Sequence, residues 1–571
     1  MERSIHSGVP ASCARHFVVV VSAMLLVVST GEAASIWHVK ADAGQGGDGT
    51  QNKPFATLQE VEAASRPGDT IRVVPSGKPL DGGIQLKDGQ RLIGLGNPVT
   101  KAAPSSALPT ITNTTNSRYD GDAVRLANNT LVQNVHVDGA SRSGIFGVNA
   151  ARAQIRDNLI TNNMIQGNDL RRLEALWPAG FVLYQSQGNH FAGITLLACG
   201  PAAASYCMTH APAVPAVADT GQTVIAGNTI RNSNLEGILL LTDTGAVANF
   251  AVTDNLVRDL SLNLPRPESL TPPVGIVRSR AFTLIALNNS RVTVNMSRFH
   301  AENFSPLGNY AADGAVFLTG GSGPVVTARV TDLAVLNPAM VGEVNNGDSV
   351  EIQHRGTSNG VLNIDMVRAD LRDPASANIK VLDAQNSSNS VYNISISDST
   401  LSNANPAGSP DIQIRFSGAT NAVKAFNLSV KNTKISGIGG GIGVASGHNL
   451  EKLALLVEGT SFADLVQPMG APPVSAITVS HPAERTIGTA VVDLGGGSLG
   501  SRGRNRFGSK TDFDVSLTNA NAATAPIKVD ASGNYWGGAA PVVAKAAPAD
   551  VMTSGNVTFS APTHLTSDPG R

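Results

Sequence analysis

Three consecutive segments of the chain share one pattern, and this repetition is the feature that most constrains the fold. The segments begin at Val350, Ile379 and Ile412, about 30 residues apart. Each opens with a short alternating strand, passes a loop of Gly, Ser and Asn, resumes with a second strand and turns a corner into a third. A period of this length predicts a solenoid, in which every repeat stacks on the one before.

The corner between the second and third strands has its own signature: an apolar residue, two residues, a small or polar residue, one residue, and a second apolar residue. It occurs in VQNVHV (Val132–Val137), IRDNLI (Ile155–Ile160), IAGNTI (Ile225–Ile230) and VTDNLV (Val252–Val257), among others. Asn158, Asn228 and Asn255 occupy the same slot in three repeats. At the spacing of neighbouring strands we expect these amides to form a hydrogen-bonded ladder; the alternative is a set of solvated turns.

Composition supports an all-β chain. Charged residues make up 15% of the sequence, against about 25% in an average globular protein. The 58 glycines suit many tight turns, and 42% hydrophobic residues are sufficient for a core. The formal net charge of -1 gives no electrostatic reason to expect a nucleic acid as partner.

Residues 1–33 read as a secretory signal peptide. Arg3 and Arg15 precede an apolar run from Phe17 to Val28, and small residues follow at Gly31–Ala33. The run is shorter than the roughly 20 residues that span a bilayer, although an uncleaved anchor is the alternative. No later segment reads as a transmembrane helix. We therefore expect an exported protein, periplasmic or extracellular, that begins at Ala34.

Cleavage at this point also removes Cys13. Cys199 and Cys207 then remain close together in the mature chain. An even pair in an exported protein predicts a local disulfide, with two free thiols as the alternative. Two thiolates do not complete a tetrahedral zinc site, so the sequence predicts no metal there.

Both ends of the repeat region resemble right-handed parallel β-helix proteins of the pectin-lyase-like superfamily. After a strand at Trp37–Lys40, residues 54–64 have Pro at the start and apolar residues at helical spacing, including Leu58 and Val61. In these relatives such a helix caps the first coil, and an Asn-Tyr-Trp-Gly element like the one at residues 534–537 forms the last. The resemblance implies a single-stranded right-handed parallel β-helix over residues 34–540, with Trp536 covering the lower end of the core. Residues 541–571 would form a flexible tail.

Two stretches break the repeat, at about residues 165–223 and 260–273. Outward positions of nearby strands are apolar, for example Leu239 and Leu241. We expect the two insertions to cover that part of the surface. The later strands instead direct Glu351, Gln353, Lys380, Gln413 and Arg415 outward, which predicts a bare polar face.

The resemblance implies several possible activities, since these relatives include polysaccharide lyases, uronan epimerases, hydrolases and esterases. A lyase needs a base beside the uronate carboxyl group and often a carboxylate cluster that holds calcium. A hydrolase needs paired carboxylates. The sequence shows no Asp-Asp pair beside Gly-His-Gly, no Asp-Pro-His element and no clustered Asp at outward strand positions.

The remaining catalytic candidates form a short set: Arg278, Arg280, Glu351, His354 and Arg355. The candidate ligand strip overlaps with it and consists of Glu351, Gln353, Arg355, Lys380, Gln413 and Arg415. Lys380 should stack one coil beyond Glu351. This strip could grip a sugar chain, or it could simply hold an ion pair between coils with solvated neighbours.

Two functions stay open at this point. The first is an exported protein, without an identified activity, that presents a ladder face to a polysaccharide or an envelope protein. The second is a polysaccharide lyase or uronan epimerase acting on an acidic glycan. No cofactor is evident, and calcium enters only under the second. The sequence leaves open whether the protein is an enzyme and what its oligomeric state is.

Overall fold

The computed structural model describes residues 33–96, 108–115, 118–163, 192–200, 219–233, 236–260, 277–303, 310–337, 347–355, 359–384, 389–404, 409–417, 422–466, 474–508, 513–544 and 549–569. The predicted signal peptide lies almost entirely outside these residues. Residues Ser35–Arg571 form one compact unit.

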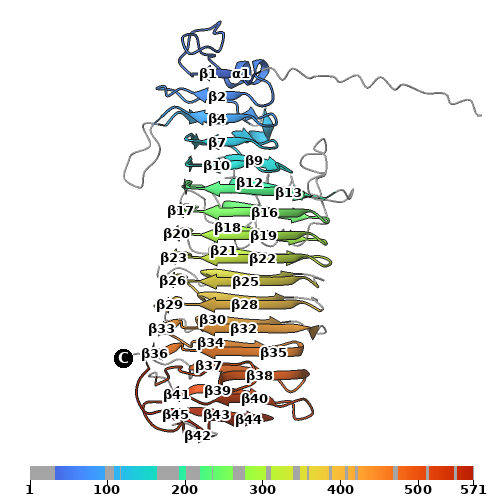
Figure 1. Ribbon diagram of the computed structural model, residues 1–571, viewed down its shortest axis with the longest axis vertical. Helices are drawn as coiled ribbons and strands as arrows, with labels where there is room; N and C mark the ends of the chain where they lie inside the picture. Colours follow the sequence, from blue (N-terminus) through green and yellow to red (C-terminus); the bar gives the residue numbers. More distant parts are fainter. Residues whose placement is uncertain are drawn as a thin grey trace, which may run out of the picture. The chain divides into compact units, whose positions relative to one another are not determined.

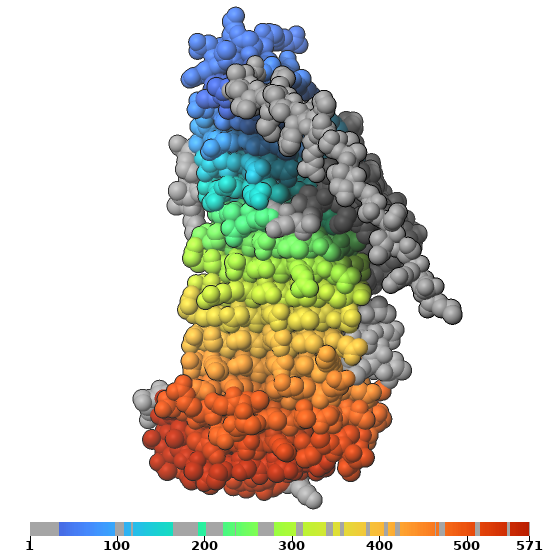
Figure 2. All heavy atoms as spheres, turned by 45° about the vertical axis from the view of Figure 1, so that its right-hand side comes forward, coloured from blue at the N-terminus to red at the C-terminus, as the bar shows by residue number. Residues whose placement is uncertain are grey.

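The chain forms a right-handed parallel β-helix whose strands line up in three parallel sheets (Figure 1). From β4 to β37 each coil of the described chain runs through sheet A, then sheet B, then sheet C. Figure 2 shows the coils following one another as bands of colour. The predicted fold class is therefore confirmed.

In the described residues, sheet A has 17 strands: β1 Ile36–Val39, β2 Thr70–Val73, β4 Arg91–Gly94, β7 Leu131–Gln133, β10 Gln154–Arg156, β13 Asp219–Ala226, β16 Val247–Thr253, β19 Arg291–Ser297, β22 Val325–Thr331, β25 Val361–Val367, β28 Val391–Ser397, β31 Ala422–Val423, β32 Ala425–Lys431, β35 Asn449–Glu458, β38 Ile487–Gly495, β40 Ile527–Ala531 and β44 Val557–Ser560. Sheet B has 11 described strands: β5 Thr110–Ile111, β8 His136–Asp138, β11 Leu159–Thr161, β14 Thr229–Arg231, β17 Leu256–Arg258, β20 His300–Glu302, β23 Ala334–Leu336, β26 Asp370–Arg372, β29 Thr400–Asn403, β33 Lys434–Ile438 and β36 Ser461–Val466.

Sheet C has 15 strands within the same described ranges: β3 Ile84–Gln85, β6 Val124–Arg125, β9 Ile145–Val148, β12 Ala192–Cys199, β15 Glu236–Asp243, β18 Val277–Leu287, β21 Tyr310–Gly320, β24 Val350–Arg355, β27 Ile379–Ala384, β30 Ile412–Ser417, β34 Ile442–Ser446, β37 Ser475–His481, β39 Phe513–Asn519, β42 Val543–Ala544 and β43 Val551–Gly555. A short pair, β41 Asn534–Tyr535 and β45 His564–Leu565, extends the stack at its C-terminal end, and a 3-10 turn spans Tyr119–Gly121.

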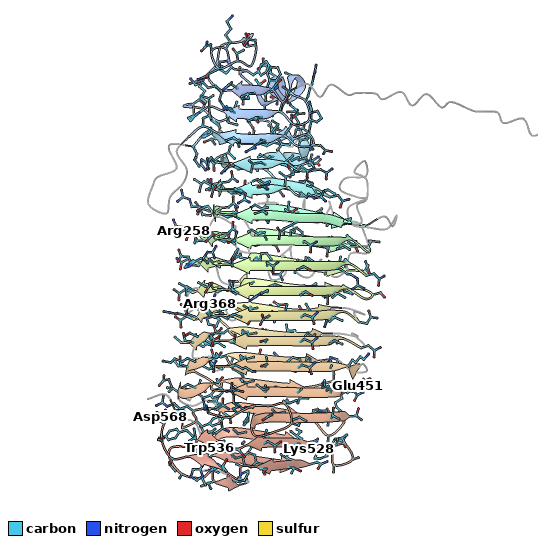
Figure 3. The ribbon with its side chains drawn as sticks, viewed as in Figure 1. Arg258, Arg368, Glu451, Lys528, Trp536 and Asp568 are labelled. Carbon is cyan, nitrogen blue, oxygen red and sulfur yellow. The ribbon has the colours of Figure 1, made fainter. Side chains whose placement is uncertain are left out.

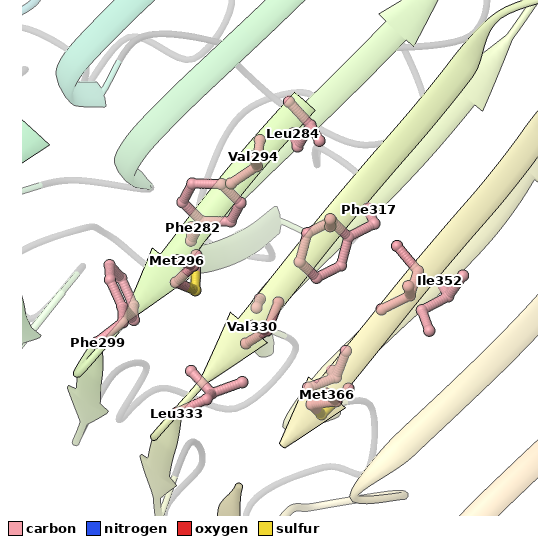
Figure 4. Close-up of a cluster of buried hydrophobic side chains, with 14 of the residues drawn as sticks. Phe282, Leu284, Val294, Met296, Phe299, Phe317, Val330, Leu333, Ile352 and Met366 are labelled. Atoms are coloured by element: carbon pink, nitrogen blue, oxygen red, sulfur yellow. The ribbon is translucent and has the colours of Figure 1, made fainter. Parts of the chain in front are cut away.

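The repeat predicted from the sequence is a stack of residues in register. Val350 pairs with Ile379, and Ile379 pairs with Ile412. All three side chains are buried in one hydrophobic core that runs through the coils. Figure 4 shows part of this core, where Phe282 packs against Phe299 and Phe317 with ring centroids 5.9 Å away in each case. Burying an aliphatic or aromatic side chain of this size contributes about 1.5–3 kcal/mol.

A short helix, α1 (Leu58–Ala64), lies at the N-terminal end of the core (Figure 1). Thr57 begins the helix with a capping box in which Glu60 bonds back to the backbone N–H of Thr57. Leu58 and Val61 are fully buried in the core. An uncapped first coil would expose apolar side chains and an unpaired strand edge, and α1 covers the apolar part.

Amides stack inside the corner between sheets A and B. Asn158 donates to the Oδ1 of Asn228 at 3.0 Å, and Asn228 donates to that of Asn255 at 3.0 Å. Both donors also bond a backbone carbonyl. The ladder therefore satisfies buried main-chain groups that the sharp turn would otherwise leave unpaired.

The residue at each of these corners that directly precedes the slot occupied by Asn255 has a left-handed backbone in the following coils too, and its side chain faces outward. In five successive coils this position holds Asp254, Arg298, Asp332, Arg368 and Asp398, all with φ between 49° and 56°. The charges alternate in sign. The Arg298 Nε lies 2.6 Å from Asp254, and the Arg368 Nε lies 2.7 Å from Asp332. Figure 3 places Arg368 at the outer edge of the stack.

Two boundaries differ from those expected. The predicted insertion at 165–223 contains β12, which pairs in parallel with β9 and β15 as a regular strand of sheet C. The prediction that residues 541–571 form a flexible tail is wrong for the described ones, because β43 pairs with β39 and buries Val551 in the core.

Trp536 is 5% exposed and stacks on Phe507 with ring centroids 4.3 Å apart (Figure 3). It does not belong to the last coil, because the strands β42 to β45 follow it in the chain.

We expect Asn228→Ala to lower the free energy of unfolding by about 2–4 kcal/mol, because it removes several buried hydrogen bonds and leaves their partners unsatisfied. Guanidinium unfolding followed by circular dichroism measures this. Asn295→Ala on the exposed side of β19 is the matched control and should change the unfolding free energy by less than about 0.5 kcal/mol. Equal effects of the two substitutions would contradict a structural role for the ladder.

Candidate functional site

The starts of successive sheet C strands bring acidic and basic side chains together. Glu236, Arg280 and Asp313 occupy one register column on β15, β18 and β21. An Arg280 guanidinium nitrogen lies 3.6 Å from Glu236, and the Arg280 Nε lies 3.4 Å from Asp313. All three side chains are at least 98% buried.

Asp348 and Glu351 extend this cluster in the next coil. Asp348 directly precedes β24, and its backbone N–H donates to the Asp313 carboxylate at 3.3 Å. Glu351 is the first outward side chain of β24. One carboxylate oxygen from each of Asp313, Asp348 and Glu351 lies within 4.8 Å of the other two. We call Glu236, Arg280, Asp313, Asp348, Glu351 and Lys380 the acid–base cluster.

Lys380 is the part of the cluster nearest to solvent. It stacks on Glu351 in register, as the sequence predicted. Its ammonium group, however, contacts the Asp348 carboxylate at 3.2 Å. The Lys380 side chain is 12% exposed, against 2% for Asp348. The cluster therefore reaches the surface through a cationic side chain.

Burial changes the acidity of two of these carboxyl groups. It raises the pKa of Glu236 to about 7, although Arg280 opposes the shift. It also raises the pKa of Asp348 to about 6; Lys380 opposes this, whereas the charges of Asp313 and Glu351 add to it. Perturbed carboxyl groups beside cations are typical of functional sites, and also of buried ion-pair networks.

The outward face of sheet C continues from the cluster into a groove. Lys380 pairs with Gln413, Gln413 with Gly443, and Gly443 with Thr478. Gln413 and Arg415 line one part of the groove, and Gly443, Ala445, Ser475, Thr478 and Ser480 line another. The groove has a volume of about 290 Å³.

Two small residues keep the floor of this groove low. Pro410 packs over Gly443, where a Cβ atom would lie 2.7 Å from the Pro410 ring. Ala445 follows in the next outward position, in register with Arg415 and Ser480. Arg415 is exposed, and no carboxylate among the described side chains pairs with it. Its guanidinium group is available to a ligand carboxylate, which it can bind through two parallel hydrogen bonds.

The other predicted residues are dispersed. His354 points into the core, not outward, because alternate side chains of a strand face opposite sides. It packs edge-on against Tyr392 at 4.4 Å, contacts the Thr319 hydroxyl group, and has its pKa lowered to about 3 by burial. It therefore shares no surface with Glu351. The side chains of Arg278 and Arg355 lie outside the described residues.

The predicted ligand strip is buried at one end and open at the other. Glu351 and Gln353 are buried although they point outward, as are Leu239 and Leu241. The expected covering insertions lie mostly outside the described residues. The expectation of a bare face is thus wrong at Glu351 and Gln353, while Gln413 and Arg415 do line open space. Cys199 is disulfide-bonded, and its predicted partner Cys207 lies outside the described residues.

The sequence did not reveal Glu236, Asp313 and Asp348 as members of one cluster. They are far apart in the chain and lie before the first inward apolar residue of their strands, where the alternation of apolar residues gives no register. The usable signal was their constant distance from the first inward apolar residue: Asp313 and Asp348 both lie two positions before the paired Ala315 and Val350.

No family model matches this chain, and no curated protein sequence matches it. Among solved structures it is similar to the Azotobacter vinelandii mannuronan C-5 epimerase AlgE6 A-module, with 10% identity over 88% of this chain and 93% of that one and a TM-score of 0.34. Pectate lyase Pel9A has 12% identity over 60% of this chain and 79% of its own, with a TM-score of 0.25. The Yersinia enterocolitica family 28 exopolygalacturonase has 11% identity over 80% of this chain and 78% of its own, with a TM-score of 0.25.

Similarity at this level assigns this chain no activity. In the described part of the chain, none of the helices combines the length and the apolar character needed to cross a bilayer.

Ionisation of Glu236 should destabilise the fold. Its pKa rises from 4.5 to about 7 on folding, so the stabilisation present below pH 4.5 is lost as the pH rises to 7. Glu236→Gln should remove this loss, which is about 3 kcal/mol. Unfolding free energies measured from pH 4 to 8 test this, with the exposed Glu451→Gln as control. A pH profile that Glu236→Gln leaves unchanged would contradict the shifted pKa.

Proposed function

We propose that this is an exported β-helix protein that binds an acidic polysaccharide along the outward face of sheet C. The observation that supports this most directly is the groove in which Arg415 and Gln413 stand beside a floor of small residues. The apolar run near the N-terminus supports export to the periplasm or beyond, where such polymers occur.

The groove suits a uronate-containing chain for three reasons. Arg415 supplies a fork of N–H donors that matches a carboxylate. Gln413, Ser475 and Thr478 supply neutral donors and acceptors for hydroxyl groups. The coils repeat every 4.8 Å or so, and therefore offer equivalent positions along an extended polymer.

Arg415→Ala should weaken binding of polygalacturonate or alginate at least tenfold, because it removes the exposed cation of the groove. Affinity gel electrophoresis and calorimetry with both polymers measure this. Arg291→Ala, an exposed arginine on sheet A, is the matched control and should leave both affinities within twofold. Binding that survives Arg415→Ala, or absence of binding by the wild-type protein, would exclude this groove as the binding site.

A polysaccharide lyase or epimerase is the second candidate, and the acid–base cluster favours it. The three carboxylates of Asp313, Asp348 and Glu351 are oxygen donors of the kind that calcium prefers, and they lie close enough to share one ion. Burial is the main cause of the raised pKa of Asp348, and the charges of Asp313 and Glu351 add to it; a bound cation would relieve that repulsion. Such an ion would supply positive charge for a substrate carboxylate.

Residues of the cluster would supply the base, the positive charge and the positioning contacts that such a reaction needs. Glu236 has a pKa near neutrality, which suits a group that accepts a proton from the carbon next to a uronate carboxyl group. Lys380 is held near the carboxylates as a cation, so it would face the substrate carboxylate and serve as a charge, not as a base. Arg280 lies between Glu236 and Asp313 and positions both.

Incubation with polygalacturonate and alginate in calcium-containing buffer tests this candidate, with new ultraviolet absorbance reporting unsaturated ends and proton NMR reporting epimerisation. Asp348→Asn and Glu236→Gln should each lower such an activity at least a hundredfold. Arg415→Ala should mainly raise KM. If activity persists in both cluster variants, the cluster is not the catalytic site. If no activity appears with the wild-type protein, the binding function alone stands.

A further inference from the structure

A second hollow lies on a different sheet from the groove. It is a trough of about 570 Å³ on the outward face of sheet A and runs across β22, β25, β28, β32 and β35. Neither the acid–base cluster nor the groove contributes a residue to it. The outward side chains of five successive coils form its lining in two parallel rows.

The first row is a half-buried ladder of amides on the outward face of the sheet. Asn363, Asn393 and Asn427 pair in register. Asn393 donates to the Oδ1 of Asn363 at 2.8 Å, and Asn427 donates to that of Asn393 at 2.8 Å. A side-chain amide has two N–H donors and two acceptor positions. Asn393 uses one of each within the ladder, so one donor and one acceptor remain for a ligand.

The second row has short, uncharged side chains in its middle. Ser395 and Ser429 pair in register and point to the same side as the amides. The next coil places Ala454 and Leu456 in the two rows, and Leu499 from a loop closes that end. The trough therefore has hydroxyl and amide groups along it and aliphatic surface at one end.

Charged side chains occur only at the ends of this lining. Arg329 and Asp365 pair in register at one end and have opposite signs. Lys452 stands at the other end. The two central coils carry neutral groups alone, which gives an anionic polymer no advantage over an uncharged one there.

These features match the two surfaces of a sugar ring. Hydroxyl groups at its rim pair with amides and serines, each of which both donates and accepts. Its C–H faces pack against aliphatic side chains such as Leu456 and Leu499. Coil stacking alone accounts for the amide ladder but not for the hollow beside it, since larger side chains than Ser and Ala would fill that space.

We propose that the trough on sheet A binds a neutral glycan chain that lies parallel to the coil axis, with Asn393 and Asn427 as its main hydrogen-bonding residues. The site is separate from the sheet C groove and would take an uncharged polymer, whereas the groove takes an acidic one. Because the two sites lie on different sheets, Arg415→Ala leaves the trough intact.

Affinity gel electrophoresis with hydroxyethyl cellulose, dextran and laminarin, each uncharged, tests this proposal with the full protein. At least one polymer should retard the wild-type protein and the Arg415→Ala variant equally. The double variant Asn393→Ala/Asn427→Ala should weaken that retardation at least fivefold. Ser429→Trp, which fills the trough and leaves the amide residues in the sequence unchanged, should do the same.

Asn295→Ala is the matched control, because Asn295 is an exposed amide on the same sheet in register with Arg329 but outside the lining. It should bind as the wild-type protein does, and circular dichroism should show every variant folded. The proposal is overturned if none of the three polymers retards the wild-type protein. It is equally overturned if both trough variants bind normally, or if polygalacturonate displaces the neutral polymer from Arg415→Ala.

Discussion

Parallel pairing of each coil with the next is the interaction on which everything else in this molecule depends. It requires the same residue of successive coils to lie in one column, so that inward columns become a continuous apolar core and outward columns become rows of aligned side chains. Surface chemistry is therefore organised along the axis. A property carried by one coil becomes a binding feature only when the neighbouring coils repeat or complement it.

The three sheets use this rule differently. Sheet C begins its strands with a buried column of acids and cations, and further along the same face it opens into a groove with an exposed arginine. Sheet A shows neutral amides and hydroxyl groups at the matching coils. The corner between sheets A and B carries buried amides inside and alternating charges outside. The acid–base cluster of sheet C differs from the other surfaces in being buried, and desolvation raises the pKa values of its carboxyl groups Glu236 and Asp348.

Sequence reasoning identified the fold because the inward apolar column is a local signal that recurs. It also placed Lys380 correctly over Glu351, since both follow the first inward residue of their strands. It failed at the acid–base cluster for a physical reason: loops between coils vary in length, so Asp313 and Asp348 are neighbours in space without a fixed spacing in the chain. His354 was assigned to the surface although the alternation of its strand already places it inside. The sequence did not predict β12, because the sequence on either side of it, residues 164–191 and 201–218, lacks the repeat pattern.

The row of left-handed corner residues has a consequence for how such a chain can change its length. Each coil contacts mainly its two neighbours, so a whole coil can in principle be gained or lost without disturbing distant ones. Loss of the single coil that carries Arg368 would set Asp332 directly against Asp398, two carboxylates in contact. Loss of two adjacent coils would restore an acid beside a base. The alternating charges therefore make the gain or loss of two coils in this region slightly more favourable than the gain or loss of one. The energy difference is small, because these ion pairs are exposed.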